Sequence, residues 1–156
     1  MHWMDDFPPL SEDIRNQILT YRGNPVFDLL GIQIERVEPG RAWLSLPFKK
    51  ELTHSGGIVQ GGIVTALADA AIAFAVLTVI YGKPVDFTSV DLKMNFIRPM
   101  AKGVMRAEGG LVHMGKRTAV GEAMIFNDAG KPVAKCLSSI MLLERGYMPS
   151  HAKKTE

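Results

Sequence analysis

Hydrophobic and polar positions alternate with different periods along the chain, and the first stretch predicts a helix. Residues 11–23 combine helical spacing of apolar side chains with an N-cap serine, two acids in the first turn and a closing glycine. The apolar positions are Leu10, Ile14, Ile18 and Tyr21. Residues 31–48 then predict two strands around a tight turn at Glu38-Pro39-Gly40, which together form a β-hairpin.

A long apolar run over residues 61–80 predicts a buried helix, because a helix that is apolar on all sides must be covered on all sides. From residue 63 onward its polar members are Thr65, Asp69 and Thr78. The run approaches the length of a membrane span, but Asp69 at its middle would cost ~2.5–3.5 kcal/mol on insertion scales. We therefore expect a helix surrounded by protein rather than by lipid, ending at residues 81–84.

The second half of the chain has the period of strands. In residues 86–99, apolar or β-branched side chains alternate with polar ones, which is typical of a half-buried strand. The first set is Thr88, Val90, Leu92, Met94 and Phe96. Alternation therefore puts Ser89 on the polar face, away from the helix, unless a bulge or a subunit boundary intervenes. Gly109-Gly110 predicts a bulge in the next strand, and residues 127–131 predict a hairpin turn between two further strands.

These elements predict an α+β fold in which an antiparallel sheet curls around one central helix. The six alanines of the apolar run would let strands approach that helix closely; they are at positions 66, 68, 70, 71, 73 and 75. The length of 156 residues suits one domain with a sizeable core. No internal repeat or low-complexity tract is visible.

Composition narrows the classes of function. A formal net charge of +2, with Lys and Arg scattered along the chain, argues against a nucleic-acid surface. The single cysteine, Cys136, excludes an internal disulfide and favours a reducing compartment. Because the first residues carry acids and a proline pair without an apolar segment, we expect no secretory signal and a cytoplasmic protein.

The sequence lacks the residue patterns of several common kinds of catalytic site. None of the four histidines has metal-ligand spacing to a cysteine or to another histidine, so we expect no metal site. Ser138 and Ser139 lie in a predicted strand with no visible base, which argues against a Ser-His-Asp triad. The loop SGGIVQGG lacks the Gly-Lys-Ser/Thr ending of a nucleotide-binding P-loop.

Gly61 and Gly62 open the apolar helix and are better candidates for chemistry. A helix N-terminus presents free N–H groups and the positive end of a dipole, and glycine lets a ligand approach that backbone closely. An oxyanion site is therefore possible there if a base or nucleophile is near. Asp69 is the candidate, and two interpretations stay open: a functional carboxylate, or a structural one in an ion pair or at a less buried face.

At these residues the sequence resembles a known family. GGIVQGGIVTALADAAIAFA is similar to the helix motif of PaaI-type acyl-CoA thioesterases, which have the hotdog fold. The later stretch, from a strand ending in Arg-Pro to Asp-x-Gly-Lys-x-Val-Ala, also resembles the family pattern. The resemblance extends over residues 31–143. It implies a helical extension at residues 1–30, a hotdog thioesterase domain at 31–145 and a flexible tail at 146–156.

The resemblance implies roles for individual residues. Asp69 matches the carboxylate that activates water or attacks the thioester, and Gly61 matches the glycine whose N–H polarises the thioester carbonyl. Ser89 matches a position that helps hold the water in some members. Gln60 and His54 stand where many members have His and Asn or Gln, respectively. Both side chains can still donate a hydrogen bond, and His54 could also act as a base.

The implied function is hydrolysis of an acyl-CoA by a homodimer, paired further into a homotetramer, without a metal or cofactor. Expected substrate contacts comprise the helix start, the helix middle and basic residues for the coenzyme A phosphates. They are Gly62, Ala73, Phe74, Lys102, Arg106, Lys116 and Arg117. Two alternatives stay open: a hotdog hydratase or dehydratase that pairs His54 with Asp69, and a domain that binds acyl-CoA without turnover.

Overall fold

Two short helices and a hairpin precede one long helix, and four strands follow it, in residues 6–146, the part of the chain that the computed structural model describes. The helices are α1 (Glu12–Leu19), α2 (Pro25–Leu30) and α3 (Gly61–Ile80), with a single 3-10 turn at Lys50–Leu52. The strands are β1 (Gln33–Glu38), β2 (Arg41–Pro47), β3 (Val85–Phe96), β4 (Val104–Met114), β5 (Thr118–Phe126) and β6 (Pro132–Glu144).

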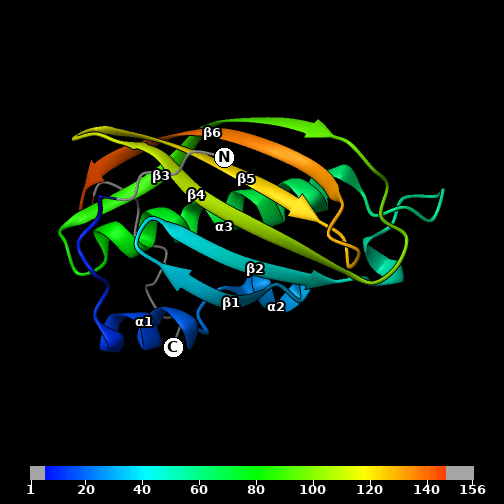
Figure 1. The fold of residues 1–156 in the computed structure, drawn as a ribbon, viewed down its shortest axis with the longest axis horizontal. Coiled ribbons are helices and arrows are strands. Elements are labelled where there is room, and N and C mark those ends of the chain that lie inside the picture. Colours follow the sequence, from blue (N-terminus) through cyan, green and yellow to red (C-terminus); the bar gives the residue numbers. More distant parts are fainter. Residues whose placement is uncertain (1–5, 147–156) are drawn as a thin grey trace.

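All six strands form one antiparallel sheet in the order β1-β2-β4-β5-β6-β3. The sheet curves over α3, which runs along its inner face, and α1 and α2 lie beyond the β1 edge (Figure 1). The predicted arrangement, an antiparallel sheet around one long helix, is confirmed. The order leaves β1 and β3 as the two edges, and β3 joins the sheet only through β6.

The short-range predictions for turns and caps are largely confirmed. The β1–β2 hairpin turns at Gly40, whose φ of 70° suits glycine, and Asn127 closes the β5–β6 turn by accepting from two backbone N–H groups. Ser11 caps α1 as predicted.

The predicted end of the first helix at Gly23 is wrong. Helix α1 stops at Leu19, because Asn24 and Pro25 start a separate helix, α2. The predicted tail at 146–156 lies outside the described residues from 147 onward.

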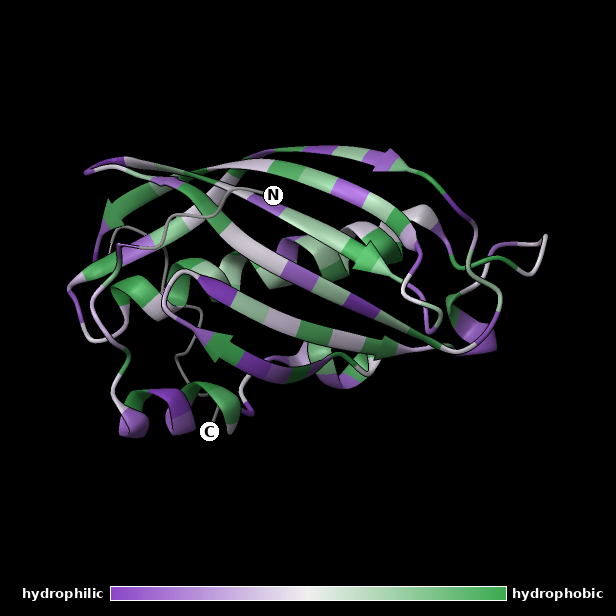
Figure 2. Ribbon diagram, in the orientation of Figure 1, coloured by the Kyte–Doolittle hydropathy of each residue, from purple (hydrophilic) through white to green (hydrophobic). Residues whose placement is uncertain are grey.

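The apolar helix α3 is covered mainly by the inner face of the sheet (Figure 2). By length and composition it could cross a membrane, but 61% of its most apolar window is buried inside the molecule, as in a core helix. A very close approach joins Ala71 to β4. A Cβ on Gly109 would lie 2.5 Å from the backbone carbonyl of Ala71, so only glycine fits there.

Two of the register shifts in the sheet bear on the predictions, because the bulge expected at Gly109-Gly110 lies elsewhere and a bulge in β3 is the exception that the alternation had left open for Ser89. The bulge in β4 lies between Leu111 and His113 rather than at Gly109-Gly110, since these glycines pair regularly with β5. In β3 the register shifts between Ser89 and Asp91, so Val90 is the extra residue. The predicted alternation across residues 88–96 is therefore wrong at its start, and Ser89 faces the helix.

The Gly109–Ala71 contact leads to a prediction about stability. Gly109→Ala should lower the free energy of unfolding by about 1–3 kcal/mol, because its methyl group would overlap backbone atoms of α3 that cannot move alone. Gly62→Ala is the control, since a Cβ there would meet nothing within 4 Å, and no loss is expected. Urea unfolding of both variants measures this, and an unchanged midpoint for Gly109→Ala would contradict the packing described.

Candidate functional site

Asp69 projects from the middle of α3 toward β3 and receives a hydrogen bond there. Ser89 Oγ donates to Asp69 Oδ1 over 2.8 Å, and both residues are partly buried. The contact exists because the bulge at Val90 turns Ser89 to the inner face. Asp69 takes part in none of the salt bridges found among residues 6–146. Its partner is therefore a neutral hydroxyl group rather than a lysine or an arginine.

Cys136 lies on the inner face of β6, opposite Met94 of β3, and is fully buried. Burial raises the pKa of the Cys136 thiol to about 11, and the negative charges of Asp69 and Asp91 contribute in the same direction. The thiol therefore stays protonated at neutral pH and is a neutral neighbour of these two aspartates.

The N-terminus of α3 presents a free backbone donor. Gln60 is the N-cap, and its carbonyl accepts from the N–H groups of Ile63 and Val64. The N–H of Gly61, the first helical residue, has no acceptor within residues 6–146. A Cβ on Gly62 would meet nothing within 4 Å, so the helix end is open on that side. An anionic oxygen could approach this backbone directly.

A cavity of about 330 Å³ lies at this helix end. Its walls come from the loop before α3, the start of α3, and the segment that leaves β3, and they include His54, Gly61, Phe96, Arg98 and Met100. A Cβ on Gly61 would lie 3.1 Å from Cζ of Phe96, so the ring packs against the glycine. Sequence patterns alone assigned no role to Phe96 or Arg98, although the Arg98-Pro99 pair at the end of a strand was a visible signal.

The loop before α3 orients His54. Its Nδ1 accepts from the Gly56 N–H over 2.9 Å, so a neutral ring carries its proton on Nε2 and can donate from there. The Gln60 side chain is exposed and makes no hydrogen bond within the described part of the chain. The structure thus gathers His54, Gln60 and Gly61 at one end of α3, whereas Asp69 and Ser89 meet farther along it.

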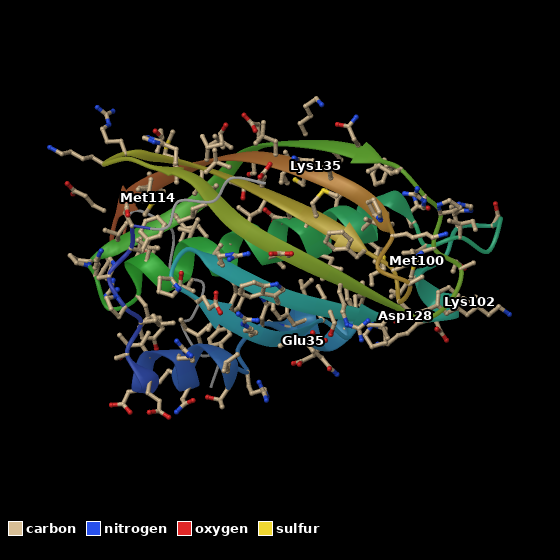
Figure 3. All side chains as sticks on the ribbon, in the orientation of Figure 1. Glu35, Met100, Lys102, Met114, Asp128 and Lys135 are labelled. Carbon is tan, nitrogen blue, oxygen red and sulfur yellow. The ribbon has the colours of Figure 1, made fainter. Side chains whose placement is uncertain are left out.

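The four basic residues expected to hold coenzyme A phosphates do not form one cluster within a chain. Lys102 and Arg106 lie near the beginning of β4 and Lys116 and Arg117 follow its end, and Figure 3 shows Lys102 and Met114 at opposite ends of the sheet. Strand β4 separates the two pairs within one chain, and their contact with coenzyme A phosphates stays a prediction. Arg106 is also paired with Asp128 at 3.0 Å.

Asp128 is held as an anion by two neighbours. The Val104 N–H and then the Arg106 guanidinium lower the pKa of the Asp128 carboxyl by hydrogen bonding. Arg106 is thus engaged within its own chain, which leaves Lys102 as the unpaired basic residue of that pair within the described salt bridges.

Other predicted contacts have different surroundings. Phe74 is only 6% exposed and its ring centroid lies 5.5 Å from that of Phe27, so it belongs to the core, while Ala73 is partly exposed. A larger cavity of about 430 Å³, between α2 and β1, contains none of the predicted site residues. Within residues 6–146, no three His, Cys, Asp or Glu side chains are grouped as a metal site would require.

Comparison with known proteins identifies relatives over most of the chain. The model of the thioesterase superfamily matches residues 56–134. A protein of Saccharolobus solfataricus named "Putative esterase" is 33% identical over 133 residues, which cover 85% of this chain and 86% of that protein. A second Saccharolobus solfataricus protein of the same name is 33% identical over 122 residues, with 78% and 86% covered.

Solved structures agree with these relatives. A variant of the phenylacetic acid degradation protein PaaI from Thermus thermophilus superposes with a TM-score of 0.70 and 26% identity, covering 77% of this chain and 100% of that one. PaaI from E. coli gives 0.73 and 23%, covering 79% and 87%, and supports the fold alone. The chain therefore belongs to the thioesterase superfamily, with the hotdog fold of the PaaI proteins, and this membership supports thioester hydrolysis as its general reaction.

Proposed function

We propose that this protein hydrolyses an acyl-CoA thioester, using Asp69 of one chain and the Gly61 N–H of a second chain. The observation that carries the proposal is the 2.8 Å hydrogen bond from Ser89 Oγ to Asp69 Oδ1. Asp69 is the charged residue of α3 and is partly buried, and burying a carboxylate even in part costs free energy, which favours a functional reason for its place there. The serine fixes one oxygen, and Oδ2 has no partner within residues 6–146, which leaves it available for a water or a thioester.

The Gly61 N–H suits the other half of the reaction. Attack on a thioester places negative charge on the carbonyl oxygen, and a donor fixed in advance at a helix end stabilises that charge without reorganising. Asp69 either accepts a proton from the attacking water or attacks the carbonyl itself and forms an anhydride that water then cleaves. In both routes the C–S bond breaks, and the coenzyme A thiol leaves with a proton. Neither route requires a metal or a cofactor.

The two groups are too far apart to act on one substrate within a chain. Gly61 and Asp69 are eight residues apart on α3, which corresponds to ~12 Å along the helix axis. A thioester carbon must lie about 3 Å from both the attacking atom and the oxyanion donor. A two-fold dimer resolves this, because Gly61 of each chain can face Asp69 of the other, giving two equivalent sites.

Strand β3 offers the surface for that dimer. It is an edge strand, so its outer backbone groups are available to a further strand. Its apolar side chains are also unusually open, with Val90 52%, Leu92 37% and Phe96 59% exposed. Antiparallel pairing of β3 with its copy would put the Phe96 end of one chain, near Gly61, beside the Val85 end of the other. Exposed Leu137 and Met141 on the outer face favour further pairing into a tetramer.

The same pairing suggests how separate basic residues serve one substrate. Lys102 lies at the Gly61 end of its chain, whereas Lys116 and Arg117 lie at the end where β3 begins. Antiparallel pairing of β3 would bring these opposite ends of two chains to the same side of the dimer. We assign the coenzyme A phosphates to this combined surface, and the cavity at Gly61 to the thioester end of the substrate.

The first test concerns Asp69. Asp69→Asn keeps the size of the side chain and should lower kcat by about 10²–10⁴, because the amide can neither attack nor accept the proton. The measurement is release of coenzyme A thiol across a panel of aryl, short-chain and medium-chain acyl-CoAs. Asp13→Asn, an exposed change on α1, is the control and should retain wild-type rates.

Two outcomes would count against a thioesterase. Turnover of the best substrate at a near wild-type rate by Asp69→Asn would remove Asp69 from the mechanism. A change of the acyl group without free thiol would instead indicate a hydratase or dehydratase, and binding without any product would indicate a domain that only binds acyl-CoA.

The second test removes the Gly61 N–H itself. Gly61 is the first helical residue and Gln60 has φ −56° and ψ 134°, so a proline is compatible with both positions. Gly61→Pro should lower kcat by about 10²–10³ by deleting the oxyanion donor. Gly61→Ala is the matched control, because it keeps the N–H while adding a Cβ near Phe96. Equal activity of the two variants would exclude the donor role.

The third test asks whether the sites are shared. Asp69→Asn and Gly61→Pro chains, each inactive alone, are unfolded and refolded together. With shared sites, a mixed dimer has one site with both defects and one intact site. Random pairing then restores about a quarter of wild-type activity, from two-fold symmetry and equal mixing. Absence of recovery in verified mixed dimers would show that each site lies within one chain.

A further inference from the structure

The orientation of Ser89 depends on a single irregularity in β3. Opposite β6, Ser89 pairs with Ile140 and Asp91 pairs with Ser139, so Val90 has no partner. Side chains alternate between the faces of a strand, and a shift of one residue moves every side chain to the other face. Without the bulge, regular alternation would put Ser89 on the same outer face as Asp91. If Ser89 kept its inward direction instead, Asp91 would turn inward and the β3–β6 pairs that follow it would be lost. The bulge therefore decides whether Asp69 has a hydroxyl partner.

The bulge is held by two hydrogen bonds that replace regular ladder bonds. Ser138 Oγ donates to the Asp91 backbone carbonyl over 2.8 Å. The Asp91 carboxylate, through Oδ1, accepts from the Ser139 N–H over 3.1 Å. A bulge interrupts the ladder and leaves backbone groups that need other partners. Here the Ser138 side chain of β6 donates to the backbone of β3, and the Asp91 side chain of β3 accepts from the backbone of β6.

Ser138 is fully buried, with 0% of its surface exposed, and it faces inward between Cys136 and Ile140 on β6. A buried hydroxyl group is retained when it satisfies a specific acceptor, because an apolar side chain of similar size would pack as well without the cost of burying a polar group. Its acceptor is the carbonyl at the bulge, two residues from Ser89.

We propose that Ser138 is a positioning residue of the Asp69 site: its hydroxyl fixes the bulge, the bulge orients Ser89, and Ser89 orients Asp69. This inference rests on the proposed catalytic use of Asp69. It predicts an effect on turnover from a residue that, within the described part of the chain, makes no hydrogen bond to Asp69 and does not line the cavity at Gly61. It also assigns the exposed Asp91 to the same role, because the Asp91 carboxylate accepts from the Ser139 N–H and so helps to fix the bulge.

Ser138→Val and Ser138→Thr form the decisive pair, because they have nearly the same volume and differ by the hydroxyl group. Ser138→Val should lower kcat by about fivefold to tenfold with little change in KM, and Ser138→Thr should restore most of it. Ser139→Ala is the control, since it alters an outward side chain and keeps the backbone N–H that Asp91 binds; wild-type turnover is expected. Equal kcat for the valine and threonine variants would overturn the proposal.

A second route avoids the buried position. Asp91→Ala removes the acceptor of the Ser139 N–H on the surface and should reproduce the loss in kcat, whereas Asp91→Asn keeps an acceptor oxygen and should restore it. In a Ser89→Ala background, Ser138→Val should cause no further loss if it acts through Ser89. Losses that multiply in the double variant would show that Ser138 acts on the fold as a whole and would contradict the proposal.

A crystal structure of Ser138→Val separates this inference from the proposed function. The expected result is a regular β3–β6 register or a displaced Val90, with the Ser89 Oγ–Asp69 Oδ1 hydrogen bond lost. That outcome supports the positioning role whether or not Asp69→Asn abolishes turnover. An unchanged bulge and an intact 2.8 Å contact would overturn it even if the enzyme is a thioesterase.

Discussion

A helix that is apolar on every side needs a cover on every side, and this constraint shapes the whole molecule. The inner face of the six-stranded sheet covers most of α3, and close approach is possible because Ala71 meets Gly109 with no side chain between them. A curved sheet packed on one face against a helix meets this need. Asp69 is one of the partly exposed residues of α3, and it lies beside the edge strand β3.

The site combines one charge from the helix with donors that the surrounding elements supply. Asp69 is a partly buried carboxylate in an otherwise apolar segment, and such a group needs a polar partner. The chain provides a hydroxyl group from the edge strand, Ser89, rather than a cation. In the proposed reaction the donor for the developing oxyanion would be a backbone N–H at the helix end, without any side chain.

Local sequence patterns predict most of this fold but not the contact that defines the site. The apolar run predicts α3, and residues 127–131 predict their hairpin from turn chemistry alone. Residues 88–96 also satisfy a regular alternation, so the bulge at Val90 was expected only as an exception, and the hydrogen bond made there by Ser138 comes from 47 residues beyond Asp91. The four basic residues come from both ends of β4, which holds 11 residues and separates them within a chain.

The topology also determines when β3 gains its neighbouring strand during synthesis of the chain. Strand β3 leaves α3 early in the chain, yet its only neighbour in the described sheet is β6, the last strand to be made. A domain generally folds as one unit during synthesis. Residues 85–96 have no strand partner within the described sheet until residues 132–144 have been made. The bulge at Val90, and with it the orientation of Ser89 toward Asp69, can therefore be fixed only after the last strand has been synthesised.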